Sequence, residues 1–262
     1  MARDLAVRGL LRSGGVHRIP VAVPPHVLDF AHRHLVTAPS PTTSTRRVLV
    51  EACCDSVPTA TAAVGFGADR IELCGPGDGG TTPSLGLMTR CRDAVRVPIH
   101  VMVRPHTHSF VYDEDDITVM VRDIEAARAA GMDGIVVGPL RADGHIQREQ
   151  LQALVSAAGP MRVAFHRAFD RTPDATDALA TLLEAGVGLV LTAGHAPTAL
   201  AGAATLRSLR ALAGDRLVIL AGGGVRGDNV QDIVADTGVA EVHARSTDPT
   251  IVRDVVLALE GA

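Results

Sequence analysis

Two short aliphatic segments of this sequence each carry a carboxylate and a thiol. Glu51 and Cys53 lie two residues apart in VLVEAC, and Glu72 and Cys74 have the same spacing in RIELC. In a strand, this spacing places both side chains of a pair on one face. Carboxylates accept protons in acid–base catalysis, and two thiolates suit a soft ion such as Cu(I). The segments therefore predict a catalytic centre or a Cu(I) site at Cys53 and Cys74, although buried cysteines are also common as simple hydrophobic residues.

Imidazole and guanidinium groups occupy three further aliphatic segments. IHVMVR ends at Arg104, RVAFHR contains His166, and EVHARS contains His243. Asp170 follows His166 at a distance that allows it to orient the imidazole, to hold a nearby arginine or to cap a turn. The predicted catalytic residues are Glu51, Glu72, Arg104, His166, Asp170 and His243. The structural alternative is a buried ion pair between Glu51 and Arg104, with histidines that only fill the core.

A run of three glycines predicts an anion site. The string AGGGVRGDN places Gly222, Gly223 and Gly224 between an aliphatic segment and a helix start. Consecutive backbone N–H groups before a helix bind anions, and many barrels bind phosphate at this position. Arg167, and Thr192 at the end of an aliphatic segment, complete the predicted ligand-binding set. The glycines serve a tight strand-to-helix turn equally well, so that alternative stays open.

The segments belong to a regular alternation of strands and helices that begins at Val48. The strand candidates are 48–53, 70–74, 99–104, 134–138, 162–167, 189–194, 217–222 and 241–246. Between them, Ser84, Asp113 and Asp174 are typical helix N-caps, and Gly186 is typical of a helix end. Short parallel strands need helical crossovers, so eight repeats predict a single (β/α)8 TIM barrel. The alternative, a doubly wound open sheet, would carry a glycine-rich fingerprint that the first turn, CCDSVP, lacks.

A closed barrel brings the scattered polar residues together. Alternate strand residues face its interior, and functional groups lie at the C-terminal ends of the strands. If Val50 and Ala52 face the helices, Glu51 and Cys53 point inward. Burying such groups without partners is costly, so we expect them to pair, to bind a metal or to meet a ligand.

Composition excludes several chemistries. The chain has 262 residues, 47% of them hydrophobic and 21% charged, as in a globular protein. All 25 basic side chains are arginine. The absence of lysine excludes a Schiff-base aldolase and a pyridoxal phosphate enzyme, because both need a lysine amine. It also excludes a nucleotide-binding P-loop, so we predict no nucleotide cofactor. The formal net charge is −4, and the chain has no Trp, one Tyr and five Phe. A chain with net negative charge and few aromatic rings is not typical of a nucleic-acid-binding protein, so we predict no such partner.

The chain divides into two parts by composition. Residues 1–45 are rich in arginine and then in proline, serine and threonine, which predicts a poorly structured N-terminal extension; residues 46–262 form the predicted barrel. No apolar run approaches the roughly 18 residues of a membrane span. Four cysteines in a chain of this size indicate reduced thiols, so we predict a cytoplasmic protein with no membrane partner.

A series of motifs carries a resemblance to a known family. The motifs are VEACCDS, GADRIELC, GGTTPSLG, VRP followed by Phe110 and Tyr112, DGIVVG, FHRAFD, VLTAG, AGGGV and EVH. With these in order from Val48 to about Ser246, the chain resembles the copper homeostasis protein CutC family. The resemblance implies a cytoplasmic barrel that forms a homodimer. It also implies a role in copper homeostasis, with Cu(I) held by two interior cysteines that correspond to Cys53 and Cys74.

The same resemblance supports a second function. The regular polar positions of the family fall on Glu51, Glu72, Arg104, His166, Arg167, Asp170 and His243, a set more typical of an enzyme pocket than of a copper chaperone. The alternative is therefore a lyase, isomerase or hydrolase acting on a small polar or anionic compound, with a divalent metal as an option. The sequence departs from the family pattern in two loops expected at the mouth of the barrel. HTHSF stands where the family usually has RGGDF, and the stretch after the last strand is shorter than in the family.

Overall fold

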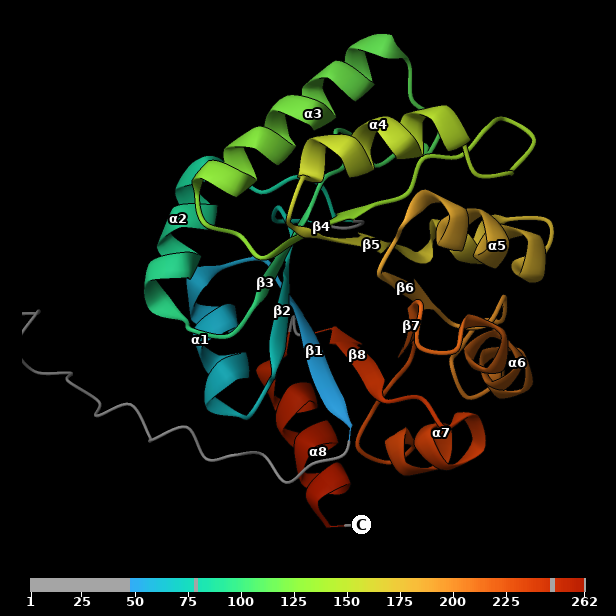
Figure 1. The fold of residues 1–262 in the computed structure, drawn as a ribbon. Coiled ribbons are helices and arrows are strands. Elements are labelled where there is room, and N and C mark those ends of the chain that lie inside the picture. The colour runs from blue at the N-terminus through green and yellow to red at the C-terminus, as the bar shows by residue number, and fades with distance from the viewer. Residues whose placement is uncertain (1–47, 78–79, 246–247, 262) are drawn as a thin grey trace, which may run out of the picture. The chain divides into compact units, whose positions relative to one another are not determined.

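Eight parallel strands form the centre of the structure. The computed structural model describes residues 48–77, 80–245 and 248–261, and within them the strands close into a barrel in chain order (Figure 1). Their bounds are β1 Leu49–Cys54, β2 Arg70–Leu73, β3 Ile99–Met102, β4 Gly134–Val137, β5 Arg162–Phe165, β6 Leu189–Thr192, β7 Val218–Gly222 and β8 Glu241–Arg245. The prediction of a single (β/α)8 barrel is confirmed, and the open sheet is excluded.

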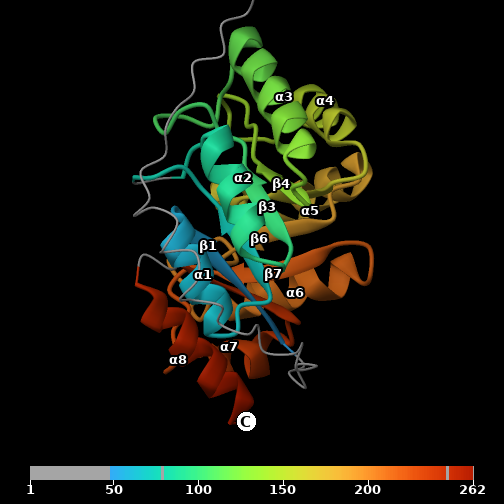
Figure 2. The same cartoon turned by 90° about the vertical axis from the view of Figure 1, so that its left-hand side faces the viewer.

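Helices follow the strands and surround the barrel (Figures 1 and 2). They are α1 Val57–Gly65, α2 Leu85–Ala94, α3 Glu114–Ala129, α4 Arg148–Ala158, α5 Ala175–Ala185, α6 Ala203–Ala213, α7 Val230–Thr237 and α8 Pro249–Glu260. The side chains of Ser84, Asp113 and Asp174 accept backbone N–H groups at the starts of α2, α3 and α5. Gly186 ends α5 in the left-handed region, at φ 78°. The predicted helix caps are therefore confirmed.

The strand register decides which side chains face the interior. Across β1, Glu51 is level with Arg70 of β2 and His243 of β8, and Cys53 is level with Glu72. The other face of each strand packs against the helices in the main hydrophobic core, where Val50 and Ala52 of β1 are fully buried. A smaller apolar cluster lies inside the barrel, formed by Cys74, Met102, Val136, Ala164, Leu189, Leu191 and Leu220. The interior is thus part polar and part apolar.

The predicted N-terminal extension and the predicted lack of a membrane span stand as follows. The extension predicted for residues 1–45 lies outside the described residues. Among the helices that the structure describes, none is both long enough and apolar enough to cross a bilayer.

Candidate functional site

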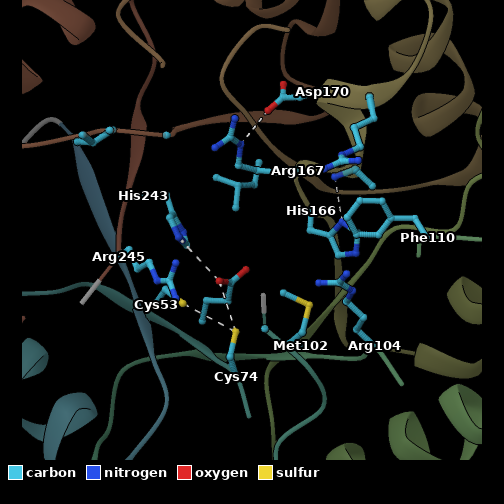
Figure 3. A pocket seen from close by; sticks show the side chains of 18 of the residues that line it. Cys53, Cys74, Met102, Arg104, Phe110, His166, Arg167, Asp170, His243 and Arg245 are labelled. Carbon is cyan, nitrogen blue, oxygen red and sulfur yellow. Dashed lines mark hydrogen bonds and ion pairs between the residues drawn. The ribbon is translucent and has the colours of Figure 1, made fainter. Parts of the chain in front are cut away.

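A cavity of about 740 Å³ opens at the C-terminal ends of the strands (Figure 3). Most of the predicted site residues line it: Cys53, Glu72, Cys74, Arg104, His166, Arg167, Asp170, Gly223, Gly224 and His243. The remaining three, Glu51, Thr192 and Gly222, are buried behind this lining. A cavity of this volume suits a small molecule, and its position is the usual one for active sites of such barrels.

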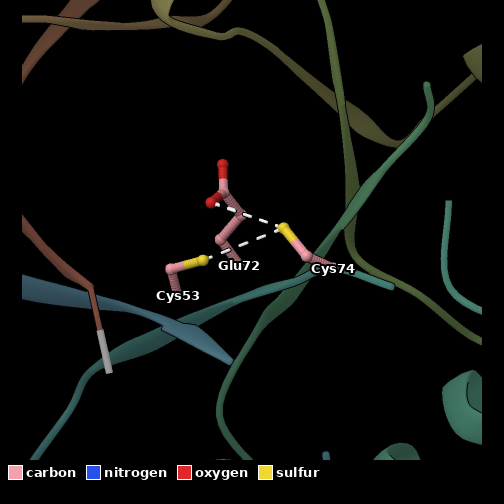
Figure 4. A group of neighbouring side chains, drawn as sticks. All are labelled: Cys53, Glu72 and Cys74. Atoms are coloured by element: carbon pink, nitrogen blue, oxygen red, sulfur yellow. Dashed lines mark hydrogen bonds between the residues drawn. The ribbon is translucent and has the colours of Figure 1, made fainter. Parts of the chain in front are cut away.

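One end of the cavity holds Cys53, Glu72, Cys74 and His243, which we call the sulfur cluster. The two Sγ atoms face one another at 3.8 Å, and Cys74 Sγ lies 3.8 Å from Glu72 Oε2 (Figure 4). The same carboxyl oxygen is 3.8 Å from His243 Nε2. Both cysteines are free. Strand β1 and the residue directly after the adjacent strand β2 therefore bring together the two thiols that the sequence singles out, with a carboxyl and an imidazole beside them.

The charges of the sulfur cluster follow from its contacts. Burial alone would lower the pKa of His243, but Glu72 and the hydrogen bonds to Cys53 and Glu51 raise that pKa well above its ordinary value. The hydrogen bond with Cys74 and the nearby His243 lower the pKa of Cys53, although burial opposes them, and the same bond raises the pKa of Cys74. Burial and the neighbouring Cys53 raise the pKa of Glu72. These contacts favour negative charge on Cys53 and positive charge on His243, and they favour the protonated forms of Cys74 and Glu72.

Below this cluster, a buried ion network fills the barrel interior. Arg70 Nε lies 2.5 Å from Glu51 Oε2, and its Nη2 lies 2.6 Å from Glu241 Oε2. Glu51 Oε1 is 2.8 Å from His243 Nδ1. Burial acts to raise the pKa of Glu51, but Arg70 and His243 outweigh it and hold the pKa well below the ordinary range. The carboxylate of Glu51 therefore holds the ring of His243 from behind and does not line the cavity.

The ion network corrects the predicted pairing of Glu51. The sequence-based alternative pairs it with Arg104, whereas its arginine partner is Arg70, which is 3% exposed. Residues 51 and 70 are level in adjacent strands, while Arg104 comes after β3, at the top of the barrel. Sequence reasoning missed Arg70, yet a signal existed, because it has the same strand parity as Glu72.

The opposite end of the cavity is cationic. We call Arg104, Phe110, His166 and Arg171 the cation cluster. The guanidinium carbons of Arg104 and Arg171 lie 4.6 and 5.5 Å from the centre of the Phe110 ring, and the ring of His166 lies 5.0 Å from it. In Figure 3, Arg104, Phe110 and His166 lie together, away from Cys53 and His243, with Met102 between Cys74 and Arg104. Loops after β3 and β5 thus form a site separate from the sulfur cluster.

His166 is held in one orientation. Its Nδ1 accepts the backbone N–H of Ala168 at 3.1 Å, so Nε2 carries the proton in the neutral ring. Burial, with the charge of Arg104, lowers the pKa of His166 to about 3. The ring lies against Gly138, where a Cβ would stand 2.0 Å from its Cε1. His166 is therefore a fixed, neutral hydrogen-bond donor.

Asp170 holds a loop and an arginine. Its carboxylate accepts Arg167 Nε at 2.8 Å and the backbone N–H groups of Ala193 and His195 at 3.0 to 3.2 Å. The hydroxyl of the fully buried Thr192 also donates to it. Of the three roles considered for Asp170, the structure shows the one in which it holds an arginine. Thr192 uses its hydroxyl for this clamp and lies outside the cavity lining.

The glycine run makes a tight turn. Gly223 and Gly224 have φ values of 104° and 72°, a region that favours glycine. A Cβ on Gly223 would stand 3.0 Å from Arg167 Nη1. The next helix, α7, begins only at Val230. These contacts fit the turn alternative, and anion binding by this run stays a prediction.

The histidines of the altered loop lie apart from the cavity lining. The rings of His106 and His108 stack at 3.7 Å, and His106 Nε2 is 3.2 Å from Asp116. This loop runs from Arg104 to Phe110, so its sequence bears on the cation cluster.

Comparison with known proteins identifies the family. The model of the CutC family matches residues 48–248. The chain belongs to the CutC family. A CutC family protein of Mesorhizobium japonicum is 43% identical over 203 residues, 77% of this chain and 79% of that protein. The copper homeostasis protein cutC homolog of Homo sapiens is 44% identical over 202 residues, 76% of this chain and 74% of that protein.

A solved structure of the same family agrees with this assignment. CutC of Streptococcus agalactiae matches with a TM-score of 0.72 and 30% identity, covering 75% of this chain and 97% of that chain. Phosphoribosylanthranilate isomerase of Thermotoga maritima, at 14% identity, has a TM-score of 0.56 over 82% of this chain and 100% of that chain. The latter likeness shows the barrel fold alone.

Proposed function

We propose that this CutC family member takes part in copper homeostasis by binding Cu(I) between Cys53 and Cys74. The observation that carries the proposal is the separation of 3.8 Å between the two sulfur atoms. Because a metal–thiolate bond is about 2.3 Å long, both sulfurs can contact one ion at this separation. Thiolates are soft ligands that select Cu(I). The human relative carries copper homeostasis in its name.

The surroundings of the two cysteines support a metal ion. Ligand atoms of Cys53, Glu72 and Cys74 all lie within 4.8 Å of one another. Met102 packs in the same apolar cluster as Cys74 and also lines the cavity, which adds a soft thioether to the site. Cu(I) binds thiolates, so binding releases thiol protons, and the contacts that lower the pKa of Cys53 make this easier for its sulfur.

A Cu(I) competition titration tests this proposal. Wild-type protein, purified anaerobically, competes with a chromophoric Cu(I) chelator, and its stoichiometry and affinity are compared with those of Cys53→Ser and Cys74→Ser. Cys91→Ser, which changes a buried cysteine of α2, is the matched control. We expect both cluster variants to lose the stoichiometric ion and the control to keep it. Wild-type affinity in both cluster variants refutes the proposal.

A second candidate is a TIM-barrel enzyme acting on a small polar or anionic compound. The observation that favours it is the number of arginines that line one cavity: Arg104, Arg167, Arg171, Arg226 and Arg245. Guanidinium groups bind carboxylates and phosphates. In this function Glu72 and His243 exchange protons with the substrate, and Glu51 is a positioning residue that fixes His243. The reaction class stays open among lyases, isomerases and hydrolases.

A divalent metal is an option within the enzyme candidate. Glu51, Glu72 and His243 each offer a ligand atom, and these atoms lie within 4.8 Å of one another. Carboxylate and imidazole ligands suit Zn²⁺ and similar ions. Elemental analysis and native mass spectrometry of the protein as purified distinguish the candidates: copper supports the first, while a retained small molecule or divalent ion supports the second.

The proposal includes a cytoplasmic homodimer, as the family resemblance implies. Four free cysteines in the described residues agree with a reducing compartment. Sedimentation equilibrium of the full chain tests the oligomeric state, and a monomer at micromolar concentration contradicts it.

A further inference from the structure

We propose that the cation cluster binds the carboxylate or phosphate group of a small molecule, with Arg104 and His166 as the two principal contacts. This inference deepens the enzyme candidate, on which it rests, and does not depend on copper binding. It names the class of ligand: a small anionic compound whose charged group lies at the opposite end of the cavity from the two cysteines.

The unused donor of His166 is the decisive observation. Its Nε2 is buried and has no hydrogen-bond partner among the described residues, while the other ring nitrogen accepts the N–H of Ala168. The residue is 5% exposed and lines the cavity. Buried donors without partners are rare, because each one loses the hydrogen bond that water would make. In the proposed complex, an acceptor atom of the ligand supplies the missing bond.

The guanidinium groups beside His166 determine the charge of that acceptor. Arg104 is 7% exposed, and its Nη2 donates to the carbonyl oxygen of Thr107 at 2.8 Å, which fixes the head group in place. Arg171 lies over the same aromatic ring, Phe110, with its guanidinium carbon 5.5 Å from the ring centre. Two guanidiniums around one ring favour a negatively charged oxygen, and the neutral imidazole adds a donor without adding charge.

The site is built before any ligand arrives. Gly138 leaves room for the imidazole, and Ala168 fixes its tautomer. Asp170 holds Arg167 and the loop after β6, which border the same cavity. A prearranged set of donors loses little conformational entropy on binding. This arrangement therefore has the features of a binding site rather than of a flexible, solvated surface.

The rest of the cavity limits the remainder of the ligand. Met102 and Leu191 line it with apolar surface. Beyond them lie the carboxyl group of Glu72 and the sulfur of Cys53. A compound with an anionic group at one end and a hydroxyl or carbonyl group at the other fits both ends. Small oxo- or hydroxy-acids and sugar phosphates have this chemistry.

Calorimetric titration tests the site with two probes, inorganic phosphate and pyruvate, on the full-length protein. The variants are Arg104→Gln and His166→Phe. Arg90→Gln, on the exposed side of α2, is the control. We expect one or both probes to bind the wild type, and each cluster variant to weaken binding at least about 10-fold, the usual effect of losing one hydrogen bond to a charged group. Phosphate binding alone assigns a phosphate ester, and pyruvate binding alone assigns a carboxylate.

Three results overturn the inference. The first is no binding of either probe to the wild type, and the second is wild-type affinity in Arg104→Gln and His166→Phe. The third is that Arg90→Gln weakens binding as much as these two variants do. If His166→Phe does not fold, the ¹⁵N shift of His166 Nε2 in the wild type replaces it, and a shift that does not change on probe addition overturns the inference. The copper proposal can fail without this inference. In that case Cys53→Ser and the wild type give the same copper titration and the same probe titration, while Arg104→Gln and His166→Phe still weaken probe binding.

Discussion

The protonation state of His166 can be tested through the pH dependence of the free energy of unfolding, and this in turn tests the cation cluster. Burial and the charge of Arg104 lower the folded-state pKa of His166 to about 3, while an unfolded histidine titrates near 6.5. Below pH 6.5 the unfolded chain therefore binds a proton at His166, and the folded protein does not. The stability that comes from this residue is fully present above the unfolded pKa and is lost as the pH falls toward 3.

The size of the effect follows from the two pKa values. One pH unit corresponds to about 1.36 kcal/mol per proton bound in only one state. Between pH 7 and pH 5 the protonated fraction of the unfolded histidine rises from about one quarter to nearly one, while the folded protein binds almost no proton at this position. Integrated over the interval, this difference gives a loss of about 2 kcal/mol. His166→Phe removes this contribution. We therefore expect the wild type to lose about 2 kcal/mol more stability than the variant over this interval.

Urea unfolding followed by circular dichroism at pH 7, 6 and 5 measures the difference. Comparing the two proteins across pH cancels the pH-independent cost of losing the hydrogen bond from Ala168. His145→Phe, at a position whose side chain is 57% exposed, controls for the removal of an imidazole. If the wild type and His166→Phe lose the same stability between pH 7 and pH 5, His166 is not buried as a neutral ring, and the reasoning that gives it an Nε2–H donor fails.

Three further predictions follow from the site. Arg70→Met leaves two buried carboxylates without their shared cation. We expect the free energy of unfolding, measured with urea, to fall by about 3 to 5 kcal/mol, and a fall below about 1 kcal/mol would contradict the ion network. Gly138→Ala places a Cβ where the His166 ring lies, so the anion probes should bind at least about 10-fold more weakly while the fold, checked by circular dichroism, persists. Iodoacetamide at pH 7 should alkylate Cys53 before Cys54, because contacts lower the pKa of the first thiol and burial raises that of the second; peptide mapping that finds equal rates refutes this ordering.

The sequence by itself determined the barrel and the inward faces of its strands. Strand and helix signals alternate with a regular period, and caps such as Ser84 and Asp174 act through hydrogen bonds with residues only two or three positions away. Alternation within a strand is equally local, so the inward direction of Glu51 and Cys53 follows from their neighbours Val50 and Ala52. Local physics of this kind needs no knowledge of distant segments.

Only the tertiary structure decided which polar groups meet. The partner of Glu51 is Arg70 and not Arg104, because strand register and height along the barrel axis depend on closure of the whole sheet. The same closure buries Glu51 behind the cavity and turns Asp170 toward a loop more than twenty residues away in the chain. Strand parity tells which way a side chain points, but the distance between two side chains from different strands is set by the three-dimensional packing of the barrel.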